Sequence, residues 1–348
     1  MWAMTQGDSV VRRLRSATLV VALAVTLVPA ACGGGAEEAD ADEDGTPDAE
    51  QSRNAGSLVE VSPLTGEQIG DDAPTHPVVV VKIDNTGAAA PQRGLGDADL
   101  VVEELVEGGS TRLAAFYWDT TPKVVGPVRS MRATDISIVK PAKAVLVASG
   151  GAPKTLRQLA SAEIPVLAEG DPGFSRDSAR DVPYNLMMDL EELVTTLGEE
   201  APPGPYLPFG PEDSWPGGEE ATTIRAVFSG GHTTSWRFEE GTGWVRPHSL
   251  AEPGDDFVPD NVLVLRAKVG DAGYVDPAGN PVPETKLAGK GAATLFHDGE
   301  AVEARWSKDG SSGSLQLATP DGEQLEVPAG TTWIELVPTG SGSLTYGM

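Results

Sequence analysis

The side chains that could carry chemistry are acids and arginines near the ends of predicted strands. Ligands of open α/β sheets bind beyond strand ends, and carboxylates and guanidinium groups recognise polar ligands through directional hydrogen bonds. Asp84 and Asn85 close the first predicted strand, and Arg129 and Arg132 follow a Gly-Pro turn. We predict that one ligand-binding cleft collects Asp84 with Asn85, Glu104 or Glu107, Arg112, Arg129 and Arg132.

Strand geometry limits this cluster, because successive side chains on a strand point to opposite faces of a sheet. Glu103 and Glu104 therefore cannot both face the same cleft. Three interpretations are open: a buried ion-pair network that holds the strand ends together, a cleft that binds a ligand, and a catalytic site in which two carboxylates act on a glycan. Whether the chain is an enzyme stays open, since the sequence does not give the distance between the carboxylates.

The loop Ser149-Gly-Gly-Ala-Pro-Lys154 is a second candidate, because it joins a predicted strand to the start of a helix. Backbone N–H groups in such a loop can hold an anion. Its predicted ligand-binding residues are Gly150, Gly151 and Lys154. The Gly-x4-Gly-Lys-Ser/Thr spacing of a P-loop is missing, and a simple tight turn is the alternative.

Other catalytic patterns find no support. The histidines, which lack the spacing of metal ligands and are expected at the surface or in packing, are His76, His232, His248 and His297. A Gly-x-Ser-x-Gly nucleophile elbow is also missing. The sequence predicts no metal site and no cofactor.

Strands must position the candidate residues. The β-branched run Val78–Ile83 predicts a strand buried on both faces. Further strands are predicted at 99–106, 111–118 and 144–149, and Glu107–Ser110 is a hairpin loop. Helices are predicted at 153–160 and after Asp189, where Glu192 completes a capping box. This mixture favours an α+β or α/β domain with a mixed sheet over residues 58–200.

The rest of the chain is predicted to be mainly β. Residues 201–220 are rich in Pro and Gly and form a predicted linker. Residues 221–340 hold short apolar runs separated by turns such as Asp298-Gly299 and Asp309-Gly310. They predict a C-terminal β domain, built as a barrel or a sandwich.

The N-terminal segment gives the cellular address. Arg12, Arg13 and Arg15 precede an apolar run, and small residues lead to Cys32, the single cysteine of the chain. This pattern predicts a lipoprotein signal peptide at 1–31 and a lipid on the sulfur of Cys32. Pro29 stands where such signals prefer Leu, so ordinary signal-peptidase cleavage is the alternative. The acidic segment 32–57 is predicted to be a disordered tether.

The charge of the chain excludes one class of partner. Its formal net charge is −27 at pH 7, which argues against nucleic acid, because nucleic-acid binding requires basic patches. It also opposes docking on an anionic membrane by charge. Attachment to the membrane therefore depends on the predicted lipid.

Short motifs in a fixed order carry a family resemblance. They include Pro63-Leu-Thr-Gly66, Val81-Lys-Ile-Asp-Asn85, Glu104-Leu-Val-Glu-Gly-Gly109, Gly126-Pro-Val-Arg-Ser130, Pro183-Tyr-Asn185 and Asp260-Asn-Val262. In this order the chain resembles the YerB-like family of bacterial lipoproteins over residues 58–337. The resemblance implies two extracytoplasmic domains of unknown function and supplies no established activity.

These observations predict a lipid-anchored protein on the extracytoplasmic face of the cell membrane. We expect it to bind an envelope ligand or partner, such as a cell-wall fragment or an envelope protein. A hydrolase or transferase that acts on cell-wall glycan through paired carboxylates is one alternative. A structural scaffold of the cell envelope is the other.

Overall fold

The computed structural model describes residues 61–70 and 73–348. The predicted signal peptide, the lipid site at Cys32 and the acidic tether at 32–57 lie outside the described residues. Within the part that is described, no helix has both the length and the apolar character needed to cross a membrane.

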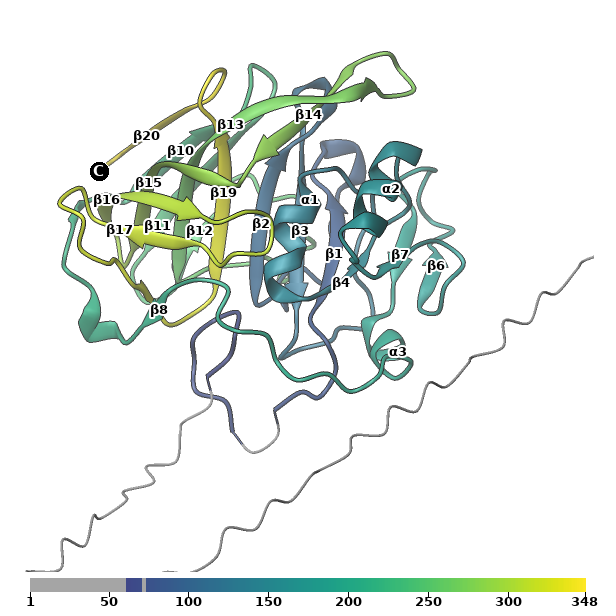
Figure 1. The fold of residues 1–348 in the computed structure, drawn as a ribbon, viewed down its shortest axis with the longest axis horizontal. Helices are drawn as coiled ribbons and strands as arrows, with labels where there is room; N and C mark the ends of the chain where they lie inside the picture. The colour runs from purple at the N-terminus through teal and green to yellow at the C-terminus, as the bar shows by residue number, and fades with distance from the viewer. Residues whose placement is uncertain (1–60, 71–72) are drawn as a thin grey trace, which may run out of the picture. The chain divides into compact units, whose positions relative to one another are not determined.

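A large mixed sheet dominates the described residues (Figure 1). Its main strand order is β17-β16-β15-β13-β19-β2-β3-β1-β4-β5, with β14 paired to β13 and β9 paired to β16. Its strands are β1 (Val79–Asp84), β2 (Leu100–Leu105), β3 (Thr111–Tyr117), β4 (Val145–Val147), β5 (Val166–Leu167), β9 (Glu219–Glu220), β13 (Asn261–Val275), β14 (Pro281–Lys286), β15 (Gly289–His297), β16 (Glu300–Lys308), β17 (Gln316–Ala318) and β19 (Thr332–Pro338).

Smaller elements surround this sheet. A second sheet, called the small sheet below, has the order β12-β11-β10-β20, and two further pairs join β18 to β8 and β6 to β7. The strands are β6 (Phe174–Arg176), β7 (Leu186–Met188), β8 (Phe209–Gly210), β10 (Thr223–Val227), β11 (Thr233–Glu239), β12 (Gly243–Val245), β18 (Val327–Pro328) and β20 (Ser343–Gly347). The helices are α1 (Asp135–Val139), α2 (Pro153–Ser161) and α3 (Leu190–Val194), with 3-10 turns η1 (Gly87–Ala89), η2 (Glu107–Gly109), η3 (Lys140–Ala142) and η4 (Glu212–Ser214).

The predicted mixed sheet is confirmed, and it joins strands from both predicted domains. β2 pairs with β3 in antiparallel and with β19 in parallel, so that Leu100 lies opposite Thr332. The chain is mainly β throughout the described residues, and α1 and α3 have five residues each. The N-terminal part is therefore poorer in helix than a doubly wound α/β domain.

Strand alternation gives the large sheet two differently covered faces. Val80 of β1 and Val102 of β2 pack with the apolar residues of α1 and α2, and we call this side the α1 face. Val79 and Val101 pack with α3 and with the small sheet, and we call this side the small-sheet face. Because the period of a strand is two, each strand contributes polar residues to both faces.

The predicted helix after Asp189 begins as expected and ends early. The Asp189 side chain accepts a hydrogen bond from the N–H of Glu192 at 2.8 Å. The hydroxyls of Thr195 and Thr196 donate to the carbonyls of Glu192 and Leu193. These side-chain bonds compete with the helical pattern, and the helix ends at Val194.

The hairpin of β13 and β14 departs most from the sequence prediction. The run Asn261–Val269 predicts a strand that ends at Val269, whereas β13 continues to Val275 and pairs with β14, which the sequence does not predict. Glycine and proline interrupt the alternation here, so pairing between the strands defines the hairpin. It reaches the start of α2, where Lys154 Nζ donates to the carbonyl of Ala272 at 2.6 Å.

Candidate functional site

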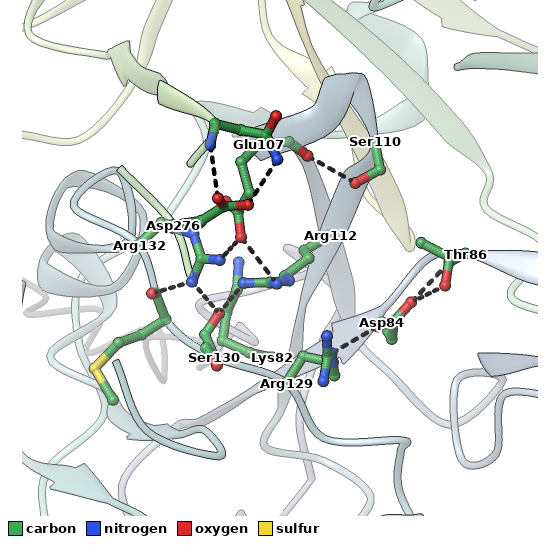
Figure 2. Close-up of polar contacts among 12 residues, drawn as sticks. Lys82, Asp84, Thr86, Glu107, Ser110, Arg112, Arg129, Ser130, Arg132 and Asp276 are labelled. Carbon is green, nitrogen blue, oxygen red and sulfur yellow. Dashed lines mark hydrogen bonds and ion pairs between the residues drawn. The ribbon is translucent and has the colours of Figure 1, made fainter. Parts of the chain in front are cut away.

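Two of the three predicted arginines, Arg112 and Arg132, contact Glu107 in the loop between β2 and β3 (Figure 2). Nε of Arg132 donates to Oε2 of Glu107 at 2.7 Å, and Nη2 of Arg132 donates to Oε1. Arg112 Nη2 lies 3.4 Å from the same Oε1, and its Nη1 donates to the Ser130 carbonyl at 2.8 Å. Nη1 of Arg132 reaches the carbonyls of Ser130 and Met131. Most N–H donors of Arg132 and two of those of Arg112 are therefore occupied by the protein itself.

Arg129 forms a separate pair with Asp84. Its Nε lies 2.7 Å from Oδ2 of Asp84, and its guanidinium carbon lies 5.4 Å from the ring centre of Tyr184. Oδ1 of Asp84 accepts hydrogen bonds from the N–H and the hydroxyl of Thr86 (Figure 2). The Arg129 side chain is 20% exposed, against 9% for each of the other two arginines, so it is the most accessible of the three.

The charges of the cluster stabilise one another. Burial opposes the ionisation of Glu107, but the hydrogen bonds and charge of Arg132 outweigh burial and lower the pKa of Glu107. Burial and the neighbouring charge of Arg132 lower the pKa of Arg112 to about 10. Arg112 therefore stays protonated at neutral pH. The contacts of Glu107, Arg112 and Arg132 agree with the first of the three interpretations given above, a buried ion-pair network.

Replacing Glu107 with glutamine tests this network. We expect Glu107→Gln to lower the free energy of unfolding by about 1–3 kcal/mol, because Arg132 and Arg112 lose a charged acceptor and repel each other. Chemical denaturation in urea measures the change. Glu191→Gln is the matched control, since Glu191 forms a solvent-exposed pair with Lys123 and surface pairs contribute little. Equal stabilities of the two variants would contradict the network.

Glu104 requires a correction, because it does not line a cleft. Its side chain is fully buried on the α1 face, and its Oε1 accepts a hydrogen bond from Lys82 Nζ at 2.7 Å. Lys82 also lies 2.8 Å from Oδ1 of Asp135 at the start of α1. Burial alone would lower the pKa of Lys82, but the charges of Asp135 and Glu104 outweigh it and raise the pKa. Glu104 thus belongs to a buried triad with Lys82 and Asp135.

Asn85 requires a second correction, because it points away from the arginines. Its Nδ2 donates to Oε1 of Glu103 at 3.0 Å and to Oγ1 of Thr111 at 2.9 Å. These partners lie on the small-sheet face, while Asp84 lies with Lys82 on the α1 face. Two consecutive residues at a strand end point to opposite faces, so Asp84 and Asn85 cannot share one site.

Gly150 and Gly151 line a pocket of about 450 Å³ together with Arg132 and two hydroxyls, those of Ser130 and Ser149. The backbone N–H groups of residues 150, 151 and 152 donate to no protein acceptor in the described part of the chain. A Cβ on Gly151 would lie 2.7 Å from Cγ of Met131, so the loop needs glycine here. The pocket therefore offers free backbone donors beside a buried guanidinium.

The hairpin of β13 and β14 closes this pocket. Tyr274, Val275, Asp276 and Val282 form its far wall, and the Tyr274 hydroxyl lies 2.8 Å from Oγ1 of Thr155. The prediction that Lys154 binds an anion in this pocket also requires correction. Its ammonium group is bound to the hairpin backbone and does not line the pocket.

Sequence reasoning missed several residues of the site. Lys82 had a visible signal, because a lone cation within a β-branched run indicates a buried ion pair. Ser130 and Ser149 adjoin predicted residues, so the same motifs already contained them. Tyr274 and Asp276 had no local signal, since they reach the pocket only through the hairpin.

Comparisons with known proteins agree with the fold. Models of the family described as "Protein of unknown function (DUF3048)" match residues 64–202 with the N-terminal domain and residues 224–334 with the C-terminal domain. The chain is 26% identical over 296 residues to "Putative lipoprotein YerB" of Bacillus subtilis (strain 168), and the match covers 80% of this chain and 86% of that protein.

A solved structure shares the fold. The crystal structure of the YerB protein from Bacillus subtilis matches this chain with a TM-score of 0.69 at 23% sequence identity, over 82% of this chain and 99% of that one. The resemblance seen in the sequence motifs is confirmed by these matches. With both domain models matched in order over most of the described residues, the chain belongs to the DUF3048 family, whose function is unknown.

Proposed function

We propose that this protein is a lipid-anchored, extracytoplasmic lipoprotein that binds a phosphorylated or similar oxyanionic envelope ligand in the Gly150–Gly151 pocket. The anchor would be the lipid on Cys32, in line with the name of the relative from Bacillus subtilis, "Putative lipoprotein YerB". Such an anchor would keep the protein at the cell membrane.

The backbone of residues 150–152 supports the binding proposal. Residues 150–152, whose backbone N–H groups donate to no acceptor among the described residues, line the same pocket as Arg132. Backbone donors of this kind hold oxyanions because they give fixed partial positive charges without a side chain to order. The hydroxyls of Ser130 and Ser149, which hydrogen-bond to each other at 3.3 Å, leave one adaptable donor for a ligand. Arg132 supplies mainly charge, because Glu107 and carbonyl groups use most of its N–H donors.

Asp276, on the other wall of the pocket, limits the charge that a ligand can carry. Asp276 is held by Asn280, whose N–H and amide group donate to its two carboxylate oxygens, and these bonds lower the pKa of Asp276. A carboxylate at this wall repels a second negative charge on the ligand. We therefore infer a ligand with one oxyanionic end and a body that is neutral, hydroxylated or cationic.

Ala152→Pro tests the pocket by removing one backbone donor. Ala152 has φ of −62° and ψ of 146°, values that proline adopts without strain. We expect the affinity of the full-length chain for inorganic phosphate and glycerol 3-phosphate to fall by about tenfold, as measured by isothermal titration calorimetry. Ala152→Ser keeps the N–H and should bind like wild type. Unchanged binding by Ala152→Pro, or no binding by wild type, would overturn the proposal.

The glycan-hydrolase alternative finds less support in the cluster. Such an enzyme needs one carboxyl group that stays protonated to act as the acid. Asp84 and Glu107 are both paired with arginines. Burial raises the pKa of Glu104, but its side chain is fully buried and cannot reach a glycan. We therefore prefer the binding function.

A further inference from the structure

A second polar cluster lies on the small-sheet face, where Glu103 of β2 is fully buried. Its Oε1 lies 2.7 Å from Nε2 of His232 and accepts a hydrogen bond from Thr111 at 2.6 Å. Its Oε2 accepts from Thr234 at 2.8 Å. With Asn85, whose amide also donates to Oε1, these side chains fix the orientation of the carboxylate and of the imidazole.

The contact with Glu103 identifies the nitrogen of His232 that carries a proton. Burial opposes ionisation of Glu103, but its contacts, first of all the hydrogen bond with His232, outweigh burial and lower the pKa of Glu103. Burial and the charge of Glu103 raise the pKa of Glu335, a neighbour on β19, well above its ordinary value. Glu103 is therefore an acceptor, and Nε2 of His232 carries the proton that it accepts. In a neutral ring the other nitrogen, Nδ1, is then an acceptor.

Nδ1 of His232 has no hydrogen-bond partner within the described residues, whereas Nε2 contacts Glu103, Thr111 and Thr234. The imidazole is 19% exposed and lines a pocket of about 350 Å³. The other residues that line the pocket include Thr86, Ser110, Thr233, Thr234 and Ser235. Alternation along β11 turns the side chain of Thr234 to the opposite side from those of Thr233 and Ser235. None of the residues that line this pocket is acidic.

Arg246 gives the pocket its cation. Its guanidinium carbon lies 4.4 Å from the ring centre of Trp333 and 5.7 Å from that of Trp236, which fixes the side chain by cation–π contact. Its Nη2 donates to Oγ of Ser249 at 3.3 Å, and it forms no ion pair with any described residue. Burial lowers the pKa of Arg246, and the charges of Glu103, Asp256 and Glu335 only partly offset this effect.

We propose that this pocket is a second binding site, independent of the oxyanion pocket, and that it takes a sugar acid. The carboxylate of the ligand pairs with Arg246. A ligand hydroxyl donates to Nδ1 of His232, and the wall hydroxyls bind the others. The volume accommodates one sugar ring. The Glu103 carboxylate acts as a positioning group, because it holds the histidine in the tautomer that accepts.

Calorimetry of the full-length chain with glucuronate and N-acetylmuramate tests the proposal, with glucose as the neutral control. We expect both acids to bind wild type and glucose to bind at least tenfold more weakly. Arg246→Gln should lose about tenfold or more in affinity for glucuronate, while Arg246→Lys keeps most of it. Ala152→Pro, which alters the oxyanion pocket, should bind glucuronate like wild type, so the two proposals fail separately.

Nitrogen NMR of the imidazole gives a second readout that does not depend on affinity. We expect Nε2 of His232 to be protonated and Nδ1 to be unprotonated, and the Nδ1 signal to move when glucuronate is added. His232→Gln, which keeps a donor toward Glu103, should remain folded and weaken binding. Failure of both acids to bind wild type, equal binding of glucose, or an Nδ1 signal that does not move would overturn the proposal.

Discussion

Replacing Lys82 with methionine is expected to lower the free energy of unfolding by about 3–5 kcal/mol, because it leaves two buried carboxylates without their cation. Lys82 is fully buried, and its Nζ lies 2.7 Å from Glu104 and 2.8 Å from Asp135. Neither acid has another ion-pair partner among the described residues. Urea denaturation followed by tryptophan fluorescence measures the loss.

Removing the acids as well separates charge from packing. The triple variant Lys82→Met, Glu104→Gln and Asp135→Asn leaves no buried charge, so we expect it to recover much of the stability lost by Lys82→Met. If Lys82→Met alone unfolds at the same urea concentration as wild type, Lys82 does not compensate the acids. In that case the triad contributes nothing to the stability of the sheet.

The free energy of unfolding is expected to fall as pH rises, because Asp99 loses a proton. Asp99 is buried and accepts hydrogen bonds from the N–H groups of Trp118 at 2.6 Å and Asp119 at 3.2 Å. Burial, and then the charge of Asp119, raise the pKa of Asp99 from 3.8 to about 8. Above its ordinary pKa the unfolded chain releases this proton while the folded chain keeps it. The stabilisation is therefore complete below about pH 4 and is lost as pH rises to about 8.

Asp99→Asn isolates this effect. One pKa unit corresponds to about 1.4 kcal/mol, so the shift of Asp99 makes several kcal/mol of stability dependent on pH. The asparagine keeps a side-chain oxygen for Trp118 and Asp119 but cannot lose a proton. Urea denaturation at pH 5 and pH 8 should show a smaller decrease for Asp99→Asn than for wild type. Parallel decreases would show that another group causes the pH dependence.

Local signals in the sequence were sufficient for most of the strands that carry the site. The β-branched run before Asp84 forms β1, and the loop Glu107–Ser110 connects β2 to β3. Alternation also placed Glu103 and Glu104 on opposite faces, as predicted. These features depend on short-range sterics and on the period of a strand, and both can be read from neighbouring residues.

The composition of the pocket could not be predicted in the same way. Arg132 and Gly150 were predicted site residues, yet the opposing wall comes from the β13–β14 hairpin, which carries Tyr274 and Asp276. That hairpin was only partly predicted, because its Gly and Pro residues break the alternation of apolar and polar positions. Its position depends on long-range strand pairing and on contacts such as Lys154 with Ala272.

By itself, the sequence determined the family and the β-rich mixed character of the fold, and it identified the arginines and acids as a group. Tertiary structure alone decided which of them meet. It paired Glu107 with Arg132 and Arg112, buried Glu104 against Lys82, and turned Asn85 to the other face. The physical reason is that the type of a residue defines which hydrogen bonds and ion pairs its side chain can form. Strand register and burial then decide whether another side chain or a ligand forms them.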